Sequence, residues 1–310
     1  MKGETSAQVR LPLSYPREEI FHKLGCTSRR LHMQPQPTPF FREAGTGPGA
    51  VCLHSNASSS SQWRGLMDAL APSFHVLAAD SFGAGKGPTW PVDHPLSLQD
   101  EVALLEPVFA RAGDPFVLVG HSYGAAVALI AAVSQPQRVR ALALYEPTLF
   151  SVVDAEAPPP NDADGIRGAV AGAAAALDAG NPDGAAACFI DYWMGPGTWA
   201  RTPAQRKGPI AASVVNVRGW ARALLDEPTP LQAFSRLDIP VLYMMGRDSP
   251  ASSRAVGRLL TQTLPRVQVV EFDGLGHMGP VTHPEVVNAA IVRFLEQCRL
   301  NTASSEKVGI

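Results

Sequence analysis

Short apolar runs alternate with longer segments of helical pattern along most of this sequence, and this alternation constrains the fold more than any other feature. The apolar runs are rich in Val, Leu or Ala, end at turn signals, and lie at residues 50–54, 74–79, 116–119, 139–144, 240–245 and 267–272. The helical candidates are residues 60–70, 98–111, 122–134, 252–264 and 284–298. Strands that alternate with helices build βαβ units, whose parallel strands are buried on both faces. The sequence therefore predicts an α/β fold with a mostly parallel sheet flanked by helices.

Composition excludes several classes of protein. The 310 residues are 45% hydrophobic and 17% charged, which is enough apolar material for a sizeable core. The net charge of −2 gives no electrostatic reason to expect a nucleic-acid partner or an anionic membrane surface. The longest apolar run, residues 125–133, is too short to span a bilayer, and residues 1–10 lack the apolar stretch of a secretory signal. We therefore expect a cytoplasmic protein that is a monomer or a homodimer.

The cysteines support the same location. They have neither CxxC nor zinc-site spacing, which predicts thiols in a reducing compartment and no metal site. The four residues are Cys26, Cys52, Cys188 and Cys298.

Residues 150–229 break the alternation of strands and helices. This segment contains three consecutive prolines at 158–160, an Ala-rich stretch at 168–180 and an aromatic cluster at 189–199. We predict a helical cap, inserted between the strand that ends near 145 and the strand that starts near 240. The core then consists of residues 38–149 and 230–298, with an N-terminal arm at 1–37 and a C-terminal tail at 299–310.

A candidate nucleophile lies at the end of the third predicted strand. Residues 116–119 run directly into Gly120-His121-Ser122-Tyr123-Gly124, and small helix-forming residues follow. A nucleophile on a sharp strand-to-helix turn occupies a strained backbone conformation and needs small neighbours. The short GxSxG pattern alone is weak evidence, but its place between a strand and a helix is the context that the chemistry requires. Ser122 is therefore the predicted nucleophile.

A serine hydroxyl needs a base, and the base needs an acid to orient it. His277 is the predicted base, because it lies in a Gly-rich loop just after the last predicted strand. His121 precedes the nucleophile, but a neighbour in a tight turn points away from it. His54 ends a strand and is assigned a hydrogen-bonding role. The remaining histidines lack a supporting context; they are His22, His32, His75, His94 and His283.

Two backbone N–H groups are needed to stabilise a developing oxyanion. We expect one from Tyr123, directly after the nucleophile, and the other from Asn56, in the loop after residues 50–54. The aromatic cluster of the cap is the expected roof of the pocket, with Phe189, Tyr192 and Trp199 among its apolar residues. The residues predicted to line the substrate pocket are His54, Ser55, His121, Trp193 and Met194.

Four ordered motifs together carry a resemblance to a known family. Residues 54–63 resemble an HGxxxSxxxW oxyanion segment, although Ser55 stands where the family usually has Gly. Residues 80–86 resemble a DxxGxGxS/R turn, residues 120–124 match the nucleophile elbow, and Gly276-His277 matches the base loop. Over residues 38–298 the chain resembles an α/β-hydrolase. The resemblance implies the α/β-hydrolase fold, a catalytic triad, and neither a metal nor an organic cofactor.

The acid of the triad has two candidates. Many members of the family place an Asp three residues after the Gly that ends the penultimate strand; here that position is Ser249, and Asp248 is one residue early. Glu146 ends the strand after the nucleophile helix, and some haloalkane dehalogenases of this superfamily carry their acid there. We prefer Glu146 and keep Asp248 as the alternative.

These residues predict a serine hydrolase that cleaves a carboxylic ester, thioester or lactone through an acyl-enzyme on Ser122, with a small acyl compound as its substrate. A cofactor-free perhydrolase or haloperoxidase, or a C–C bond hydrolase, would use the same triad. A non-catalytic small-molecule-binding protein with a hydrolase-like fold is the alternative of a different class. Haloalkane dehalogenation and epoxide hydrolysis are disfavoured, because they need a carboxylate nucleophile.

Overall fold

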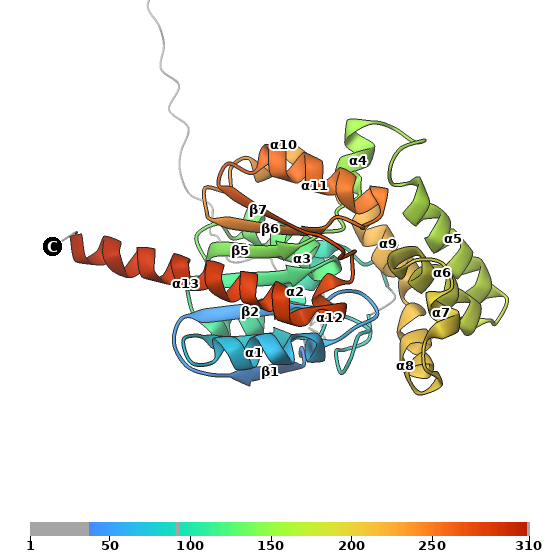
Figure 1. Ribbon diagram of the computed structural model, residues 1–310, viewed down its shortest axis with the longest axis horizontal. Coiled ribbons are helices and arrows are strands. Elements are labelled where there is room, and N and C mark those ends of the chain that lie inside the picture. Colours follow the sequence, from blue (N-terminus) through green and yellow to red (C-terminus); the bar gives the residue numbers. More distant parts are fainter. Residues whose placement is uncertain (1–36, 91–92, 309–310) are drawn as a thin grey trace, which may run out of the picture. The chain divides into compact units, whose positions relative to one another are not determined.

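A seven-stranded sheet forms the centre of the molecule (Figure 1). The computed structural model describes residues 37–90 and 93–308, with side chains as far as 299, so the predicted N-terminal arm lies almost entirely outside the described residues. The strand order is β1-β3-β2-β4-β5-β6-β7, with β1 antiparallel to β3 and all other neighbours parallel. The strands are β1 (Phe41–Ala44), β2 (Gly49–Leu53), β3 (His75–Ala79), β4 (Phe116–His121), β5 (Val139–Tyr145), β6 (Val241–Gly246) and β7 (Val267–Phe272). The predicted α/β fold with a mostly parallel sheet is confirmed.

The edge strand β1 is the one that the sequence analysis missed. Its four residues, FREA, are mostly half-exposed and include two charged side chains. Because an edge strand buries little of its surface, it needs no apolar run and leaves no signal of that kind. The six strands that were predicted end within two residues of their expected positions.

Helices cover both faces of the sheet. One face carries α2 (Leu98–Ala112), α3 (Tyr123–Ser134), α10 (Leu231–Phe234) and α11 (Ala251–Thr263). The other face carries η1 (Ser60–Trp63), α1 (Arg64–Leu70) and α13 (Pro284–Val308), and the short α12 (Gly279–Thr282) precedes α13. Along β2, Val51 and Leu53 face the first layer, while Ala50 and Cys52 face the second. Alternate side chains are thus buried on opposite faces, as a parallel sheet between two helical layers requires.

The last helix is longer than predicted. We expected it to end at Cys298, but α13 continues to Val308. Residues 299–308 contain neither Gly nor Pro, and Gly309 follows directly. Since these two residues are the strongest helix breakers, nothing in the polar sequence stops the helix earlier. Of the predicted C-terminal tail at 299–310, residues 299–308 are therefore helical.

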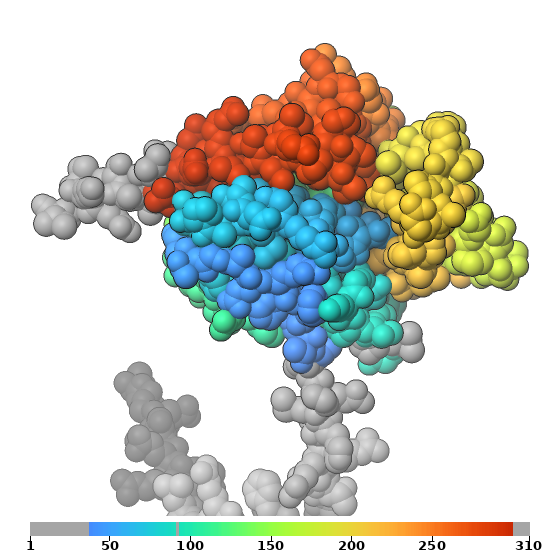
Figure 2. Space-filling view, turned by 60° about the horizontal axis from the view of Figure 1, so that its bottom comes forward, coloured from blue at the N-terminus to red at the C-terminus, as the bar shows by residue number. Residues whose placement is uncertain are grey.

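The segment between β5 and β6 folds into helices, and we call α4–α9 the cap helices. They are α4 (Ser151–Glu156), α5 (Asp164–Asp178), α6 (Pro182–Met194), α7 (Thr198–Arg201), α8 (Ala204–Val214) and α9 (Val217–Leu225). They lie beside one end of the sheet (Figure 1). Figure 2 shows their yellow part next to both the red C-terminal part of the core and the blue part that begins at residue 37. No helix among the described residues is both long and apolar enough to cross a membrane.

Candidate active site

Ser122 occupies a strained turn between β4 and α3. Its φ and ψ angles are 56° and −116°, a region that side-chain-bearing residues rarely adopt. The two glycines of the motif make this turn possible. A Cβ atom at Gly120 would lie 2.5 Å from the Cα of Ala125, and one at Gly124 would lie 2.4 Å from the carbonyl oxygen of Leu53. The sequence thus places Gly where the helix, the turn and strand β2 approach too closely for any side chain.

The other non-glycine residues with positive φ also lie at this site. Among the described residues, the non-glycine residues with positive φ are Ala57 (54°), Ser122 (56°) and Glu146 (44°). Ala57 and Ser122 line one cavity, and Glu146 is hydrogen-bonded directly behind it. Backbone strain persists only where the surrounding structure enforces it, and such positions cluster at functional sites.

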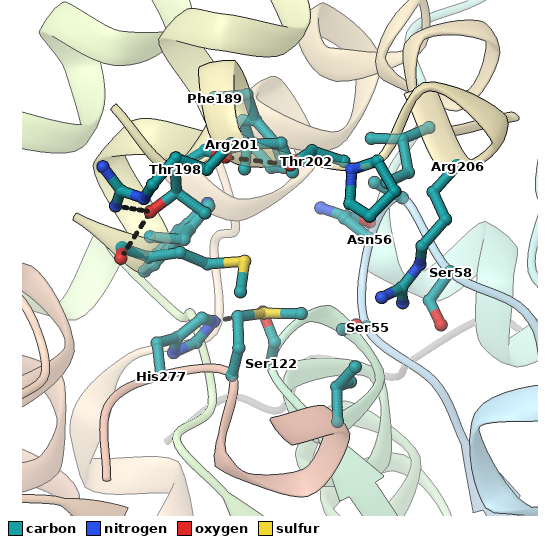
Figure 3. Close-up of a pocket in the computed structure, with 18 residues that line it drawn as sticks. Ser55, Asn56, Ser58, Ser122, Phe189, Thr198, Arg201, Thr202, Arg206 and His277 are labelled. Atoms are coloured by element: carbon teal, nitrogen blue, oxygen red, sulfur yellow. Dashed lines mark hydrogen bonds between the residues drawn. The ribbon is translucent and has the colours of Figure 1, made fainter. Parts of the chain in front are cut away.

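Three buried side chains form a hydrogen-bonded chain at the carboxyl end of the sheet. The Nε2 atom of His277 lies 2.9 Å from the Oγ atom of Ser122 (Figure 3). The Nδ1 atom of His277 lies 2.7 Å from the Oε2 atom of Glu146. The exposed fractions of Ser122, His277 and Glu146 are 5%, 1% and 0%. An ionised carboxylate only accepts hydrogen bonds, so Nδ1 carries the proton and Nε2 accepts from the serine hydroxyl.

The structure brings Glu146, and not Asp248, to the histidine. The second carboxylate oxygen of Glu146 accepts hydrogen bonds from the Ser249 hydroxyl (2.5 Å) and from the backbone N–H of Gly246 (2.7 Å). Asp248 is exposed, and its backbone N–H donates to the carbonyl oxygen of Leu275. Ser249, at the position where many family members have Asp, therefore contacts the acid that comes from the neighbouring strand.

His121 connects the loop of His277 with the loop of Ser55. Its Nε2–H donates to the carbonyl oxygen of His277 (2.9 Å), and its Nδ1 accepts from the Gln62 amide nitrogen (3.0 Å). The Gln62 amide oxygen accepts from both the N–H and the hydroxyl of Ser55, at 3.2 and 3.0 Å. Burial, and next the neighbouring His277, lower the pKa of His121 well below its usual range. A neutral ring with one donor and one acceptor nitrogen fits this network.

The prediction that His54 and His121 line the pocket is wrong. Both are buried, and neither lines the cavity above Ser122. His54 accepts from the backbone N–H of Ser81 (3.2 Å) and donates to the carbonyl oxygen of Ser55 (2.7 Å), which is the hydrogen-bonding role expected of it. A sequence shows that a histidine stands at the end of a strand, but it does not show which side of the loop its ring faces.

A cavity of about 390 Å³ opens above Ser122 (Figure 3). Its walls come from the loop at 55–58, from α6, α7 and the first half of α8, and from residues 277–281. Of the predicted pocket residues, Ser55, Trp193 and Met194 line it, as does Phe189 of the predicted roof. The Tyr192 hydroxyl is instead hydrogen-bonded to Ser252 (2.7 Å), and Trp199 is buried elsewhere in the cap.

Trp193 of the cap stacks on the predicted base. The ring centroids of Trp193 and His277 are 3.9 Å apart, and the ring planes differ by 25°. This contact covers one face of the imidazole, so the cap takes part in orienting it. No signal in the sequence relates these two residues, since they are brought together by packing of α6 over the sheet.

The predicted oxyanion donors both adjoin Ser122. Asn56 lines the cavity together with Ser122, on the loop after β2. Tyr123 is the first residue of α3, and the first N–H groups of a helix have no intrahelical acceptor. The side chain of Tyr123 points away from the cavity, where its hydroxyl donates to Glu101 (3.0 Å). Only its backbone is therefore available at the site.

A second, much smaller cavity of about 20 Å³ lies on the other side of Ser122, beneath the cap. Apart from Asn56, Ser122 and Thr148, its lining residues are apolar, and they include Phe150 and Trp220. This volume is roughly that of a single water molecule or methyl group. In the part of the chain that the structure describes, no group of three or more His, Cys, Asp or Glu side chains is arranged to hold a metal ion.

Comparison with known proteins identifies the family. The sequence profile of a family described as alpha/beta hydrolase fold matches residues 51–284, more than half of the chain. The chain belongs to the α/β-hydrolase family. Among solved structures, this α/β-hydrolase is similar to one from Sphaerobacter thermophilus, with 26% identity and a TM-score of 0.65 over 83% of this chain and 96% of that one.

Two relatives match this α/β-hydrolase over most of their length. The (E)-2-((N-methylformamido)methylene)succinate hydrolase of Acinetobacter baylyi is 23% identical over 87% of this chain and 98% of its own. The 2-(acetamidomethylene)succinate hydrolase of Mesorhizobium japonicum is 27% identical over 82% of this chain and 90% of its own.

Proposed function

We propose that this α/β-hydrolase is a serine hydrolase that cleaves a carboxylic ester, thioester or lactone through an acyl-enzyme on Ser122. The observation that carries the proposal is the buried hydrogen-bonded chain from Ser122 through His277 to Glu146, which lies beneath an open cavity. A serine, a neutral imidazole and a carboxylate in this order are the groups that acyl transfer needs.

The reaction would proceed in two halves. His277 takes the hydroxyl proton as Ser122 attacks the acyl carbon, and Glu146 stabilises the imidazolium that forms. The N–H groups of Tyr123 and Asn56 would stabilise the oxyanion; one such donor is typically worth about 3–4 kcal/mol in the transition state. His277 then protonates the leaving group, and a water molecule, activated by the same ring, releases the acid.

A second candidate is hydrolysis of an acylamino bond by the same residues. It is favoured by the two relatives that match most of the chain, since both are named as hydrolases of amido-methylene succinates. The chemistry differs only in the leaving group, which is a nitrogen that His277 would protonate. Haloalkane dehalogenation is disfavoured, because attack by Ser122 on an alkyl halide would give an ether that water does not hydrolyse.

Labelling with a fluorophosphonate probe tests the nucleophile. We expect one adduct on Ser122 in the native protein and none in Ser122→Ala, together with hydrolysis of simple acyl esters that the variant lacks. A natively folded protein that forms no adduct would refute the proposal and leave the non-catalytic, ligand-binding alternative.

Matched acid variants test the role of Glu146. Glu146→Gln removes the carboxylate that contacts His277 and should lower kcat by about 10⁴-fold, as loss of the acid does in other triads. Asp248→Asn changes an exposed side chain and should leave kcat within about twofold. The opposite result would assign the acid to Asp248.

A further inference from the structure

The large cavity above Ser122 is lined by two arginines, Arg201 and Arg206, and by no carboxylate. The composition of the cap does not explain why the cavity has arginines and no carboxylates, because residues 150–229 contain nine acidic and six basic side chains. The other three arginines of the cap are each ion-paired: Arg167 with Asp154 and Asp164, Arg218 with Asp178, and Arg222 with Asp226. Among the described residues, no carboxylate lies within ion-pair distance of Arg201 or Arg206. The unpaired arginines of the cap are thus the two at the cavity. The sixth basic side chain, Lys207, does not line this cavity, and its Nζ atom lies over the Trp199 ring, 5.0 Å from the ring centroid.

The two arginines differ in what they face. The guanidinium of Arg201 is turned toward the Thr198 hydroxyl (3.4 Å) and the carbonyl oxygen of Pro196 (3.5 Å). The guanidinium of Arg206 has no hydrogen-bond partner within the described part of the chain; only the backbone N–H of this residue is bonded, to the carbonyl oxygen of Pro203 (2.9 Å). Figure 3 shows its side chain extending from α8 toward Ser58, on the loop that also carries Asn56. Arg206 is exposed, so this charge lies at the mouth of the cavity, on the side of the predicted oxyanion donors.

The surroundings of Arg206 favour an anion. The first turn of α8 contains no acidic residue, and Thr202 and Pro203, just before this helix, line the same cavity. The positive end of the helix dipole therefore adds to the charge of the guanidinium. Most other wall residues are apolar, among them Phe189, Ile210 and Val281. Such a cavity suits an apolar ligand that carries one anionic group at its end. The planar guanidinium of arginine can pair with both oxygens of a carboxylate, so a carboxylate fits best.

We infer that the substrate carries a carboxylate that pairs with Arg206 at the mouth of the cavity, while a methyl-sized group on the other side of the reacting carbonyl occupies the small inner pocket. The inner pocket of about 20 Å³ is far smaller than the cavity of about 390 Å³, so the small group is assigned to the inner pocket and the carboxylate-bearing part to the cavity. The inference deepens the proposed function, on which its assignment of a reacting carbonyl rests.

Binding to the Ser122→Ala variant tests this pairing without turnover. The probes are 4-acetoxybenzoate and its neutral isostere 4-acetoxybenzamide, with affinities measured by isothermal titration calorimetry. We expect the carboxylate to bind about tenfold more tightly, as one partly exposed charge-assisted pair predicts. Adding Arg206→Gln should abolish the preference, and raising the salt concentration should weaken it. Arg222→Gln removes the same charge from a cap arginine outside this cavity and should leave the preference intact.

The outcomes separate this inference from the proposed function. Equal affinities for the two probes, including no detectable binding of either, would overturn the pairing, as would a preference that Arg206→Gln retains. Since Ser122→Ala cannot form an acyl-enzyme, none of these results depends on catalysis. An absent fluorophosphonate adduct on the native protein would refute the serine chemistry and leave the carboxylate preference standing.

Discussion

Glu101 provides a quantitative test of the electrostatics behind the nucleophile turn. It lies in the first turn of α2 with an exposed fraction of 0%, where it accepts hydrogen bonds from the Tyr123 hydroxyl (3.0 Å) and the backbone N–H of Phe82 (3.2 Å). Burial raises the pKa of its carboxyl from 4.5 to about 8, against a smaller opposing effect of these hydrogen bonds. At neutral pH the folded protein therefore holds this proton, whereas the unfolded chain releases it.

The sign and size of the pH dependence follow from the two pKa values. Because the pKa is higher in the folded state, the stabilising contribution is fully present below pH 4.5 and is lost as the pH rises through about 8. One proton corresponds to about 1.4 kcal/mol per pH unit inside this window. Between pH 5 and pH 8 the free energy of unfolding should fall by roughly 3.5 kcal/mol on account of Glu101 alone.

Glu101→Gln isolates this contribution, since glutamine keeps the shape of the neutral acid but does not titrate. Urea unfolding at pH 5, 6, 7 and 8, followed by tryptophan fluorescence, should show wild type losing roughly 3.5 kcal/mol relative to the variant. Glu296→Gln, on the exposed side of α13, serves as the control and should run parallel to wild type. Parallel curves for wild type and Glu101→Gln would refute the buried, protonated carboxyl.

Two further substitutions test the packing around the site. Gly124→Ala places a Cβ atom 2.4 Å from the carbonyl oxygen of Leu53 and should lower the free energy of unfolding by about 1–3 kcal/mol in the same urea assay. Its control is Gly168→Ala on α5, where the Cβ atom meets open space and should raise the free energy of unfolding by about 0.5–1 kcal/mol. Equal effects of the two substitutions would contradict the steric argument. Trp193→Ala removes the ring that stacks on His277 and should lower kcat about three- to tenfold in steady-state assays. Trp193→Phe keeps an aromatic ring at this position and should retain most activity. An unchanged kcat in Trp193→Ala would show that the stacking does not orient the imidazole.

The elements that the sequence predicts well are those whose local chemistry permits one structure. Five of the six predicted strands, β2 to β6, are almost entirely buried between the two helical layers, and the turn at residues 120–124 needs glycine on either side of Ser122 for steric reasons. The sixth, β7, is a largely exposed edge strand, but its three valines and Phe272 still form a recognisable apolar pattern. The antiparallel edge strand β1 was missed because a half-exposed strand needs no apolar run. Helix α13 continued past its predicted end because polar composition alone does not stop a helix.

Sequence reasoning reached the cap side of the site only in part, since it placed Phe189, Trp193 and Met194 at the pocket but found neither their packing nor the two arginines. Trp193 was expected in the pocket, but its stacking on His277 depends on how α6 packs over the sheet. Arg201 and Arg206 were not singled out, since an arginine on an exposed helix is ordinarily a solvated surface residue. Their significance appears only when the ion pairs of the other cap arginines are known.

The choice between Glu146 and Asp248 shows why spacing within one loop was insufficient. Strands β5 and β6 are neighbours, with Tyr145 paired to Met244, so a side chain just after β5 reaches the loop after β6 directly. There the Glu146 carboxylate meets the N–H of Gly246 and the hydroxyl of Ser249. An Asp at position 249 would bring a second carboxylate against Glu146 in a buried site, where two like charges strongly disfavour each other. A glutamate after β5 and a small hydroxyl donor at 249 are therefore complementary, and a motif search that examines either position alone misses the pair.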